Sequence, residues 1–301
     1  MQNRTSSPPP PAIRPAPTLP SSLLAWYFVI IWGSGYLATK AGLHYAAPFT
    51  FLTLRFTFAL ACVGLWALIA RPRLPASWPE FGHIAVAGLL MHAVNLGGSH
   101  YAQYLGMSAG VTALILALQP LLTALIMWRL SNEALRPRQW LGVLLGLVGV
   151  ALVVWHKVDV HAISAGALAA VAISLAAMTT ATLYQRKFCP HVDLRSAALV
   201  QFAVCVAVTA PLAWVVEGLR VNWTWQVVAA VVFLVLFGSI LAVNALHTLM
   251  RRGAATRVTS LLYLTPIFAV VLEFALFGVM PDALMIIGMV IACVGVALVN
   301  R

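Results

Sequence analysis

The six residues Val148–Val153 read V-G-V-A-L-V, and the same six letters return at Val294–Val299, 146 positions later. The match continues upstream at the same offset, in the pairs Gly142 and Gly288, Pro120 and Pro266, Leu118 and Leu264, and Leu116 and Leu262. Membrane helices use few residue types, so two valine-rich helices could look alike by chance. A shared proline at the same spacing is harder to explain in that way, and we interpret the chain as a duplication.

The composition is that of a polytopic membrane protein. Hydrophobic residues make up 62% of the chain and charged residues only 8%, whereas soluble domains carry about 25% charged residues. The net charge of +11 is scattered over short loops, so we expect no nucleic acid as a partner. The four cysteines show no C-x-x-C spacing, which supports neither a metal site nor a disulfide framework.

Ten apolar runs are long enough to cross a bilayer, which takes about 20 residues each. We place them near residues 22–42, 48–70, 81–103, 108–130, 137–156, 164–186, 194–216, 225–250, 255–278 and 281–300. The connections are short and are marked by proline or charge, so no soluble domain fits between the spans. The predicted fold class is therefore an all-α integral membrane protein with ten transmembrane helices.

The basic residues predict the orientation, because cytoplasmic loops carry an excess of Lys and Arg. Fourteen lie on one side, at positions 4, 14, 71, 73, 129, 136, 138, 186, 187, 195, 251, 252, 257 and 301. Three lie on the other side, Lys40, Lys157 and Arg220. Both termini are predicted to be cytoplasmic. Residues 1–21 are rich in Pro and Ser, and we expect a disordered tail there and no cleavable signal peptide.

The duplication has a consequence for topology. Each half has five spans, an odd number, so two tandem copies must insert with opposite orientation. We expect one five-helix repeat over residues 22–156 and a second over 164–301. Inverted repeats are common in secondary transporters, where the substrate site lies near the midplane between the two repeats.

Two matched prolines, Pro120 and Pro266, lie mid-way along their apolar runs. A proline removes a backbone hydrogen bond and frees a carbonyl, which lipid cannot satisfy. Each break should therefore face protein or a water-filled cavity. The polar residues Gln119 and Thr265 precede the two prolines, and we list all four as candidate site residues. A packing kink without any ligand contact is the alternative.

Charges inside the spans are the next candidates, because a buried charge costs roughly 2.5–3.5 kcal/mol on insertion scales. Arg55 lies in the outer half of its span, and Glu273 is the carboxylate that lies well inside one. An Arg55–Glu273 ion pair is one hypothesis, since the two residues lie at similar depth. Snorkelling of Arg55 to the outer interface is the alternative. Lys40, at the end of its span, is expected to be interfacial.

The span 81–103 is unusually polar. We expect His92, Asn95 and Gln103 to share a broad face at helical spacing, with His100 nearby. Asn244 stands in a triplet that repeats Ala93–Asn95, with a small shift from the main offset. These residues could line a cavity or form hydrogen bonds between helices. Aromatic walls are expected from Trp32, Tyr36 and Tyr263.

Two further observations concern helix packing and the absence of catalytic motifs. Gly142-x-x-x-Gly146 and Gly288-x-x-x-Ala292 are small-residue seams for close helix packing, within the monomer or in a homodimer. The chain contains no G-x-x-x-x-G-K-[ST], H-E-x-x-H or G-x-S-x-G motif. We therefore expect no ATP hydrolysis by a P-loop, no cofactor, no metal and no catalytic residue.

Several short motifs, in order, resemble EamA-type proteins of the drug/metabolite transporter superfamily. They are Ile31–Lys40 followed by Pro48 and Leu54-Arg55-Phe56, Leu118-Gln119-Pro120, the run 142–153 with its second copy, and Thr182–Lys187. The resemblance implies ten helices in two inverted halves, a location in the bacterial inner membrane, a central cavity and export of amino acids or other metabolites. Members often end the helices at 108–130 and 255–278 with Gly-Glu, whereas Gly278-Val279 lacks the acid.

The leading hypothesis is a secondary active transporter of a small zwitterionic or anionic metabolite, and the resemblance implies export. The protein would work by alternating access in the lipid bilayer. Proton or ion coupling and a homodimer stay open. The alternatives are a membrane-embedded enzyme acting on a lipid-linked substrate, a broad exporter of lipophilic drugs, and a sensor subunit without transport. The scattered acidic residues form no enzyme motif, and no soluble output domain is present.

Overall fold

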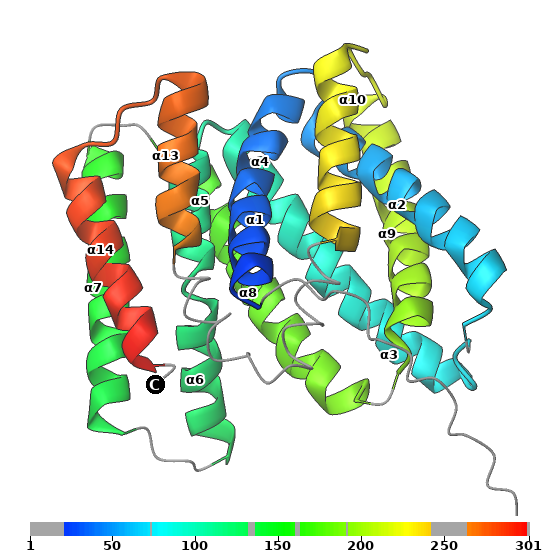
Figure 1. Cartoon of the computed structure of the whole chain (residues 1–301), viewed down its shortest axis with the longest axis horizontal. Helices are drawn as coiled ribbons and strands as arrows, with labels where there is room; N and C mark the ends of the chain where they lie inside the picture. Colours follow the sequence, from blue (N-terminus) through cyan, green and yellow to red (C-terminus); the bar gives the residue numbers. More distant parts are fainter. Residues whose placement is uncertain are drawn as a thin grey trace, which may run out of the picture.

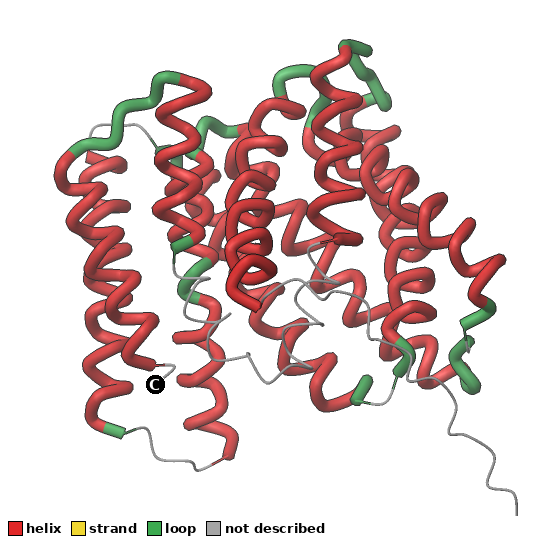
Figure 2. The backbone as a smooth tube through the Cα atoms, in the orientation of Figure 1, coloured by secondary structure: helices red, strands yellow, loops and turns green. Residues whose placement is uncertain are grey.

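The computed structural model describes residues 21–72, 74–131, 136–159, 163–190, 192–241 and 264–299, and these are mainly helical (Figures 1 and 2). The helices are α1 (Ser21–Leu43), α2 (Pro48–Ala70), α3 (Trp78–Gly88), η1 (Leu89–Val94), α4 (Asn95–Tyr104), α5 (Ala109–Leu116), α6 (Gln119–Ser131), α7 (Pro137–Asp159), α8 (Ala165–Phe188), α9 (Leu194–Glu217), α10 (Trp225–Val232), η2 (Phe233–Leu241), α13 (Thr265–Phe277) and α14 (Ala283–Val299). The described parts of every predicted span are mainly helical, with a break at Ala117–Leu118 inside the span 108–130.

The helix ends follow local sequence signals. Serine or aspartate side chains accept a hydrogen bond from a first-turn amide of α3, α5, α8 and α9, at Ser77, Ser108, Ser164 and Asp193 respectively. Gly278 ends α13 with a φ of 67°, a left-handed conformation that glycine adopts without steric cost. Caps of this kind satisfy backbone groups that lipid could not.

The exterior of the bundle is apolar, as a membrane protein requires. Large hydrophobic side chains such as Leu68 and Ile69 on α2 are 75% and 85% exposed. Five helical segments among the described residues are long and apolar enough to cross a bilayer: Pro48–Ala70, Trp78–Tyr104, Ala109–Leu130, Ala165–Phe188 and Arg195–Glu217. Shorter apolar helices account for other predicted spans, including Thr265–Phe277 and Ala283–Val299.

The predicted break at Pro120 is present. The helix stops at Leu116, and α6 begins at Gln119, so Pro120 lies in its first turn, where the missing N–H has no helical partner to lose. Pro266 occupies the first turn of α13 in the same way. The two prolines thus begin half-helices at positions related by the 146-residue offset.

Each half also carries a π-helical segment in its third span. The segment η1 covers Leu89–Val94, and η2 covers Phe233–Leu241. Shifted by the 146-residue offset, η2 corresponds to positions 87–95, which include all of η1. π-Helical insertions are rare and frequently occur at functional sites. Their paired occurrence therefore indicates that the third span of each half contributes to a functional site.

The repeated hexapeptides meet in one helix pair, α7 against α14, on the left of Figure 1. A Cβ atom added to Gly142 would lie 2.5 Å from the Gly295 carbonyl oxygen, and one added to Gly288 would lie 2.6 Å from that of Gly149. The earlier glycine of one helix faces the later glycine of the other, so the helices run antiparallel. The contact is also exchanged by the repeat offset, which is what two inverted halves require. The predicted glycine seam therefore lies within the monomer.

The remaining helices complete the bundle on either side of α1, α4 and α8 (Figure 1). One apolar core gathers residues of α5, α7, α8 and α14, including Leu114, Val150 and Met289. A second core gathers residues of α2, α9, α10 and η2, including Phe51 and Val235. Between these two cores the structure leaves room for a central cavity.

Candidate functional site

A cavity with a volume of about 100 Å³ lies between the two halves. The first half contributes side chains from α1, α2, α4 and α5, and the second half contributes α8 and η2. Its lining comprises Ile31, Trp32, Gly35, Tyr36, Thr39, Arg55, Asn95, Leu96, Ser99, His100, Gln103, Leu116, Met178, Leu234 and Gly238. Because one water needs about 10–15 Å³ on this scale, the cavity has room for several waters or a small solute.

Helical spacing explains which side chains reach the cavity. Trp32 and Tyr36 are four residues apart on α1, and Asn95, Ser99 and Gln103 follow one another at the same interval on α4. Residues at this interval share one helix face. The cavity therefore brings together five of the predicted site residues, namely Trp32, Tyr36, Arg55, Asn95 and Gln103.

Arg55 is the charged side chain of the cavity lining. Its guanidinium donates to the Ser239 Oγ of η2 over a long 3.5 Å. Among the described residues it has no carboxylate within ion-pair distance. The helix α2 thus places one partly buried cation in the cavity, with its charge uncompensated by a described acid.

The hypothesis of an Arg55–Glu273 pair is wrong, because Glu273 is bound elsewhere. Its Oε1 lies 2.6 Å from the Lys40 Nζ and accepts from the Ala109 amide at 3.1 Å, and its Oε2 accepts from the Gly110 amide at 3.0 Å. The carboxylate is 2% exposed and lies at the N-terminus of α5, where the helix dipole favours a negative charge. Lys40 is therefore an ion-pair partner and not a free interfacial lysine.

Two polar atoms of the lining have no hydrogen-bond partner among the described residues. They are the His100 Nε2 and the Gln103 Oε1, on side chains that are 2% and 7% exposed. Buried polar atoms are nearly always paired, so these two atoms are poised for a water or a ligand. Asn95 differs, because its carbonyl and amide oxygens accept from the Ser174 Oγ of α8 at 2.6 and 2.8 Å.

Other predicted site residues lie outside the lining. The His92 Nε2 lies 3.3 Å from the Gln201 Oε1 of α9, and the Gln119 amide donates to the Thr182 Oγ1 of α8 at 2.8 Å. Both therefore join neighbouring helices. Thr265 is buried at the start of α13, with an Oγ1 that has no described partner. Asn244 and Tyr263 lie outside the described residues.

Sequence reasoning missed two polar residues of the lining, Thr39 and Ser99, and it named His100 only as a neighbour of the polar face. Spacing could have identified both of the missed residues. Ser99 stands mid-way between Asn95 and Gln103, and Thr39 lies seven residues after Trp32 on the same face of α1. The apolar residues of the lining, such as Met178 and Leu234, carried no signal that distinguishes them from lipid-facing or core positions.

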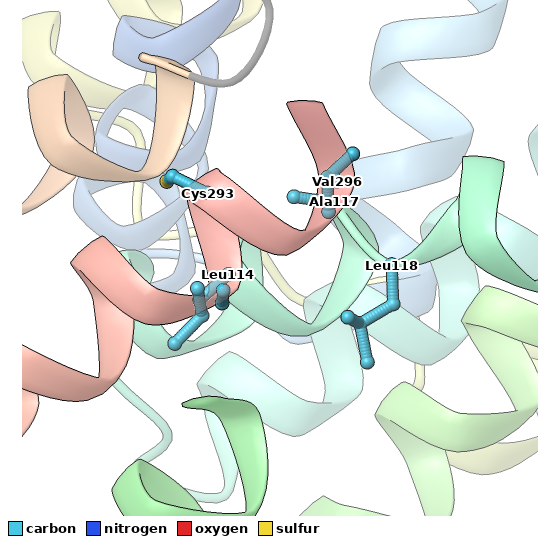
Figure 3. Close-up of a pocket in the computed structure, with 6 residues that line it drawn as sticks. Leu114, Ala117, Leu118, Cys293 and Val296 are labelled. Atoms are coloured by element: carbon cyan, nitrogen blue, oxygen red, sulfur yellow. The ribbon is translucent and has the colours of Figure 1, made fainter. Parts of the chain in front are cut away.

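A smaller hollow lies between α5, the following turn and α14 (Figure 3). Leu114, Ala117, Leu118, Cys293 and Val296 surround it, together with Ala292. Ligand sites need a few precisely placed polar groups among apolar ones, and this lining supplies only apolar side chains and one thiol. We therefore place the candidate site in the central cavity.

Comparisons with known proteins agree with this architecture. The model of the EamA-like transporter family matches residues 19–155 and again residues 164–301. The uncharacterized inner membrane transporter YedA of Escherichia coli K12 is 29% identical over 259 residues, covering 85% of this chain and 82% of its own. The uncharacterized transporter YvbV of Bacillus subtilis is 24% identical over 288 residues, covering 94% and 92%.

Two more comparisons are less extensive or less similar. A protein of Salmonella typhimurium named as a probable amino-acid metabolite efflux pump is 28% identical over 131 residues, which is 44% of this chain and 42% of its own. A crystal structure superposes with a TM-score of 0.66 at 22% identity, covering 92% of this chain and 95% of the other. At that identity the superposition shows the shared fold alone.

Proposed function

The chain belongs to the EamA-like transporter family, which its two halves match in turn, and we propose that it is a secondary active exporter of small metabolites such as amino acids. It is a multi-pass inner-membrane protein built as two inverted repeats. We propose alternating access, in which the two halves expose one central site to either side of the membrane in turn.

The central cavity is the observation that carries this proposal. It lies between the inverted halves, combines apolar walls with Arg55, His100 and Gln103, and has a size suited to a small solute. Secondary transporters bind their substrates at such an interface, and ligand sites combine apolar walls with a few polar anchors. Within the site we assign Trp32 and Tyr36 to the aromatic wall.

Further features of the carrier belong to the same proposal. The distribution of Lys and Arg supports cytoplasmic termini, with the connection between the halves outside. The glycine seam is occupied within the monomer, so a homodimer would need another surface. Because the described lining contains no carboxylate, the candidates for proton coupling are His100 in the lining and, outside it, His92 and Glu273.

Counterflow in proteoliposomes tests the proposal without knowledge of any coupling ion. Vesicles are loaded with one unlabelled amino acid or related metabolite at a time, and uptake of a labelled trace of the same compound is followed. We expect saturable accumulation of at least one compound, reduced about tenfold or more in Arg55→Gln, because charged hydrogen bonds contribute about 1.5–3 kcal/mol.

Thr57→Ala is the matched control, since Thr57 is exposed on the same helix and lies outside the cavity lining. This variant should transport like the wild type. Absence of counterflow for every small metabolite, in vesicles that retain folded protein, would contradict the transporter proposal. Equal transport by Arg55→Gln and Thr57→Ala would instead contradict the assigned site.

A further inference from the structure

The chain has seven aspartate and glutamate residues, and none of the five whose side chains the structure describes lines the central cavity. Glu273 is bound to Lys40 and α5, and Glu217 accepts from Phe49 and Thr50 at the N-terminus of α2. Glu80, Asp193 and Asp282 each accept from a backbone amide at or just before the start of a helix. Asp159 is the last residue of α7, and Glu133 lies outside the described residues, in the connection between α6 and α7.

The longest segment outside the described residues adds basic side chains but no acid. Residues 242–263, which follow η2 in the second half, contain Arg251, Arg252 and Arg257 but no aspartate or glutamate. Among the described residues, the cavity therefore holds the positive charge of Arg55 without a carboxylate to balance it. A positive group on a ligand would find no opposite charge there and would meet repulsion from Arg55.

The ligand-facing atoms agree with a negatively charged ligand. A guanidinium binds a carboxylate through two parallel hydrogen bonds, and the only described hydrogen bond of Arg55 is the long one to Ser239. The His100 Nε2 is buried without a partner and, as an N–H tautomer, can donate to an anion. The Gln103 Oε1 is likewise unpartnered and can accept from a hydroxyl or a water on the ligand.

The number of charges selects the class of anion. One guanidinium balances one carboxylate, whereas a phosphate monoester carries a charge of about −1.5 to −2 at neutral pH. The rest of the lining is apolar or aromatic, with Ile31, Trp32, Leu116, Met178 and Leu234 around the polar group. Such walls suit a branched aliphatic or aromatic body.

From these observations we infer that the preferred substrate is a small organic monoanion, with one carboxylate held by Arg55, an apolar body and no ammonium group. This inference rests on the proposed function and specifies the substrate class of the same cavity. It also fits export, because an anion that leaves the cytoplasm moves down an inside-negative membrane potential.

Two sets of three compounds, each set sharing one apolar side chain, separate the charge classes. The aliphatic set is 4-methyl-2-oxopentanoate, leucine and 3-methylbutylamine, and the aromatic set is phenylpyruvate, phenylalanine and phenethylamine. Isothermal titration calorimetry on the full chain in detergent measures binding directly, with glycerol 3-phosphate as the dianionic probe. We expect at least one 2-oxo acid to bind about tenfold or more tightly than its amino acid, and the amine not to bind.

Variants of the cavity test the assigned contacts. Arg55→Gln should weaken binding of the 2-oxo acid about 10- to 100-fold, as loss of a charge-assisted hydrogen bond does, and Arg55→Lys should retain part of it. Gln103→Glu introduces the missing carboxylate and should also weaken binding of the anion about tenfold or more. Thr57→Ala should bind like the wild type. Size-exclusion profiles and thermal midpoints report whether each variant is folded.

The comparison on the wild type needs no variant and decides the inference. Equal or tighter binding of the amino acid, tighter binding of glycerol 3-phosphate, or binding of neither 2-oxo acid would overturn it. Counterflow of leucine or phenylalanine in the same preparation would then leave the transporter proposal standing. Conversely, tight binding of a 2-oxo acid without counterflow of any compound would contradict transport and support the anion site.

Discussion

Glu273 shows how one buried acid can connect a helix of the second half to two helices of the first. The carboxylate belongs to α13, its counter-ion Lys40 belongs to α1, and its two amide donors belong to the first turn of α5. The Lys40 ammonium also lies 4.9 Å from the centre of the Phe277 ring. Since the Glu273 side chain is only 2% exposed, water cannot replace the partners of its carboxylate.

Glu273→Gln should therefore lower the stability of the protein. A glutamine loses the negative charge opposite Lys40 and must turn one N–H₂ group toward a backbone or ammonium donor. We expect a loss of about 1.5–3 kcal/mol, the range for hydrogen bonds to charged groups. The apparent midpoint of thermal unfolding in detergent, followed by size-exclusion chromatography, measures the change.

Glu80→Gln is the matched control for this substitution. Glu80 accepts from the Ala76 amide near the exposed start of α3, and glutamine serves equally well at this position of a capping box. Its midpoint should stay close to that of the wild type. Equal losses in the two variants would show that the carboxylate of Glu273 has no special role.

The candidate site was only partly predictable, because depth along a helix does not select a side chain's partner. Arg55 and Glu273 lie at similar depth, but α2 and α13 stand on opposite sides of α1 (Figure 1). Helical spacing did place Asn95 and Gln103 on the cavity face. His92, on the same span, instead faces Gln201 of α9, since His92 lies within the π-helical segment η1, whose wider turn shifts the register relative to α4.

At the scale of elements, the α7–α14 pair depends on the absence of side chains at its glycines. Gly149 has the Ala292 backbone nitrogen 2.5 Å from the position that a Cβ would occupy, and backbone atoms cannot move aside as a flexible side chain can. The antiparallel contact thus requires glycine at this point of the repeated hexapeptide.

Gly149→Ala should destabilise the protein by about 1–3 kcal/mol, the range for overpacking a close-packed interior. Gly64→Ala on α2 is the control, because a Cβ added there meets no atom within 4 Å. That variant should be neutral or more stable by about 0.5–1 kcal/mol, since alanine favours helix over glycine. Thermal midpoints in detergent compare the two. A neutral Gly149→Ala would contradict the close approach of α7 and α14.

The helices themselves were more predictable than their partners. Apolar length and punctuation by proline, glycine and serine are local properties, so the predicted ends of the spans agree with the helix ends to within a few residues wherever those ends lie among the described residues. The glycine spacing also identified α7 and α14 as closely packed helices. Spacing alone could not choose between packing within the monomer and packing in a dimer, because both use the same small residues.

At the scale of the whole molecule, two independent features describe one topology. The glycine contacts show that the last helices of the two halves run antiparallel, which requires halves of opposite orientation. The basic residues, fourteen on one side and three on the other, predict which side faces the cytoplasm. Neither feature can be deduced from the other, since the glycine contacts orient the halves only relative to each other and not relative to the membrane.

Reporter fusions test the orientation in cells. A green fluorescent protein joined after Arg301 should fluoresce, and alkaline phosphatase at the same point should be inactive, because the C-terminus is expected in the cytoplasm. Alkaline phosphatase inserted between the halves, after His161, should be active, because that connection is expected outside. The reverse pattern at both points would contradict the assignment from charge while leaving the inverted repeat intact. The same reporter result at both points would contradict five helices per half, since an odd number of crossings must separate the two sites.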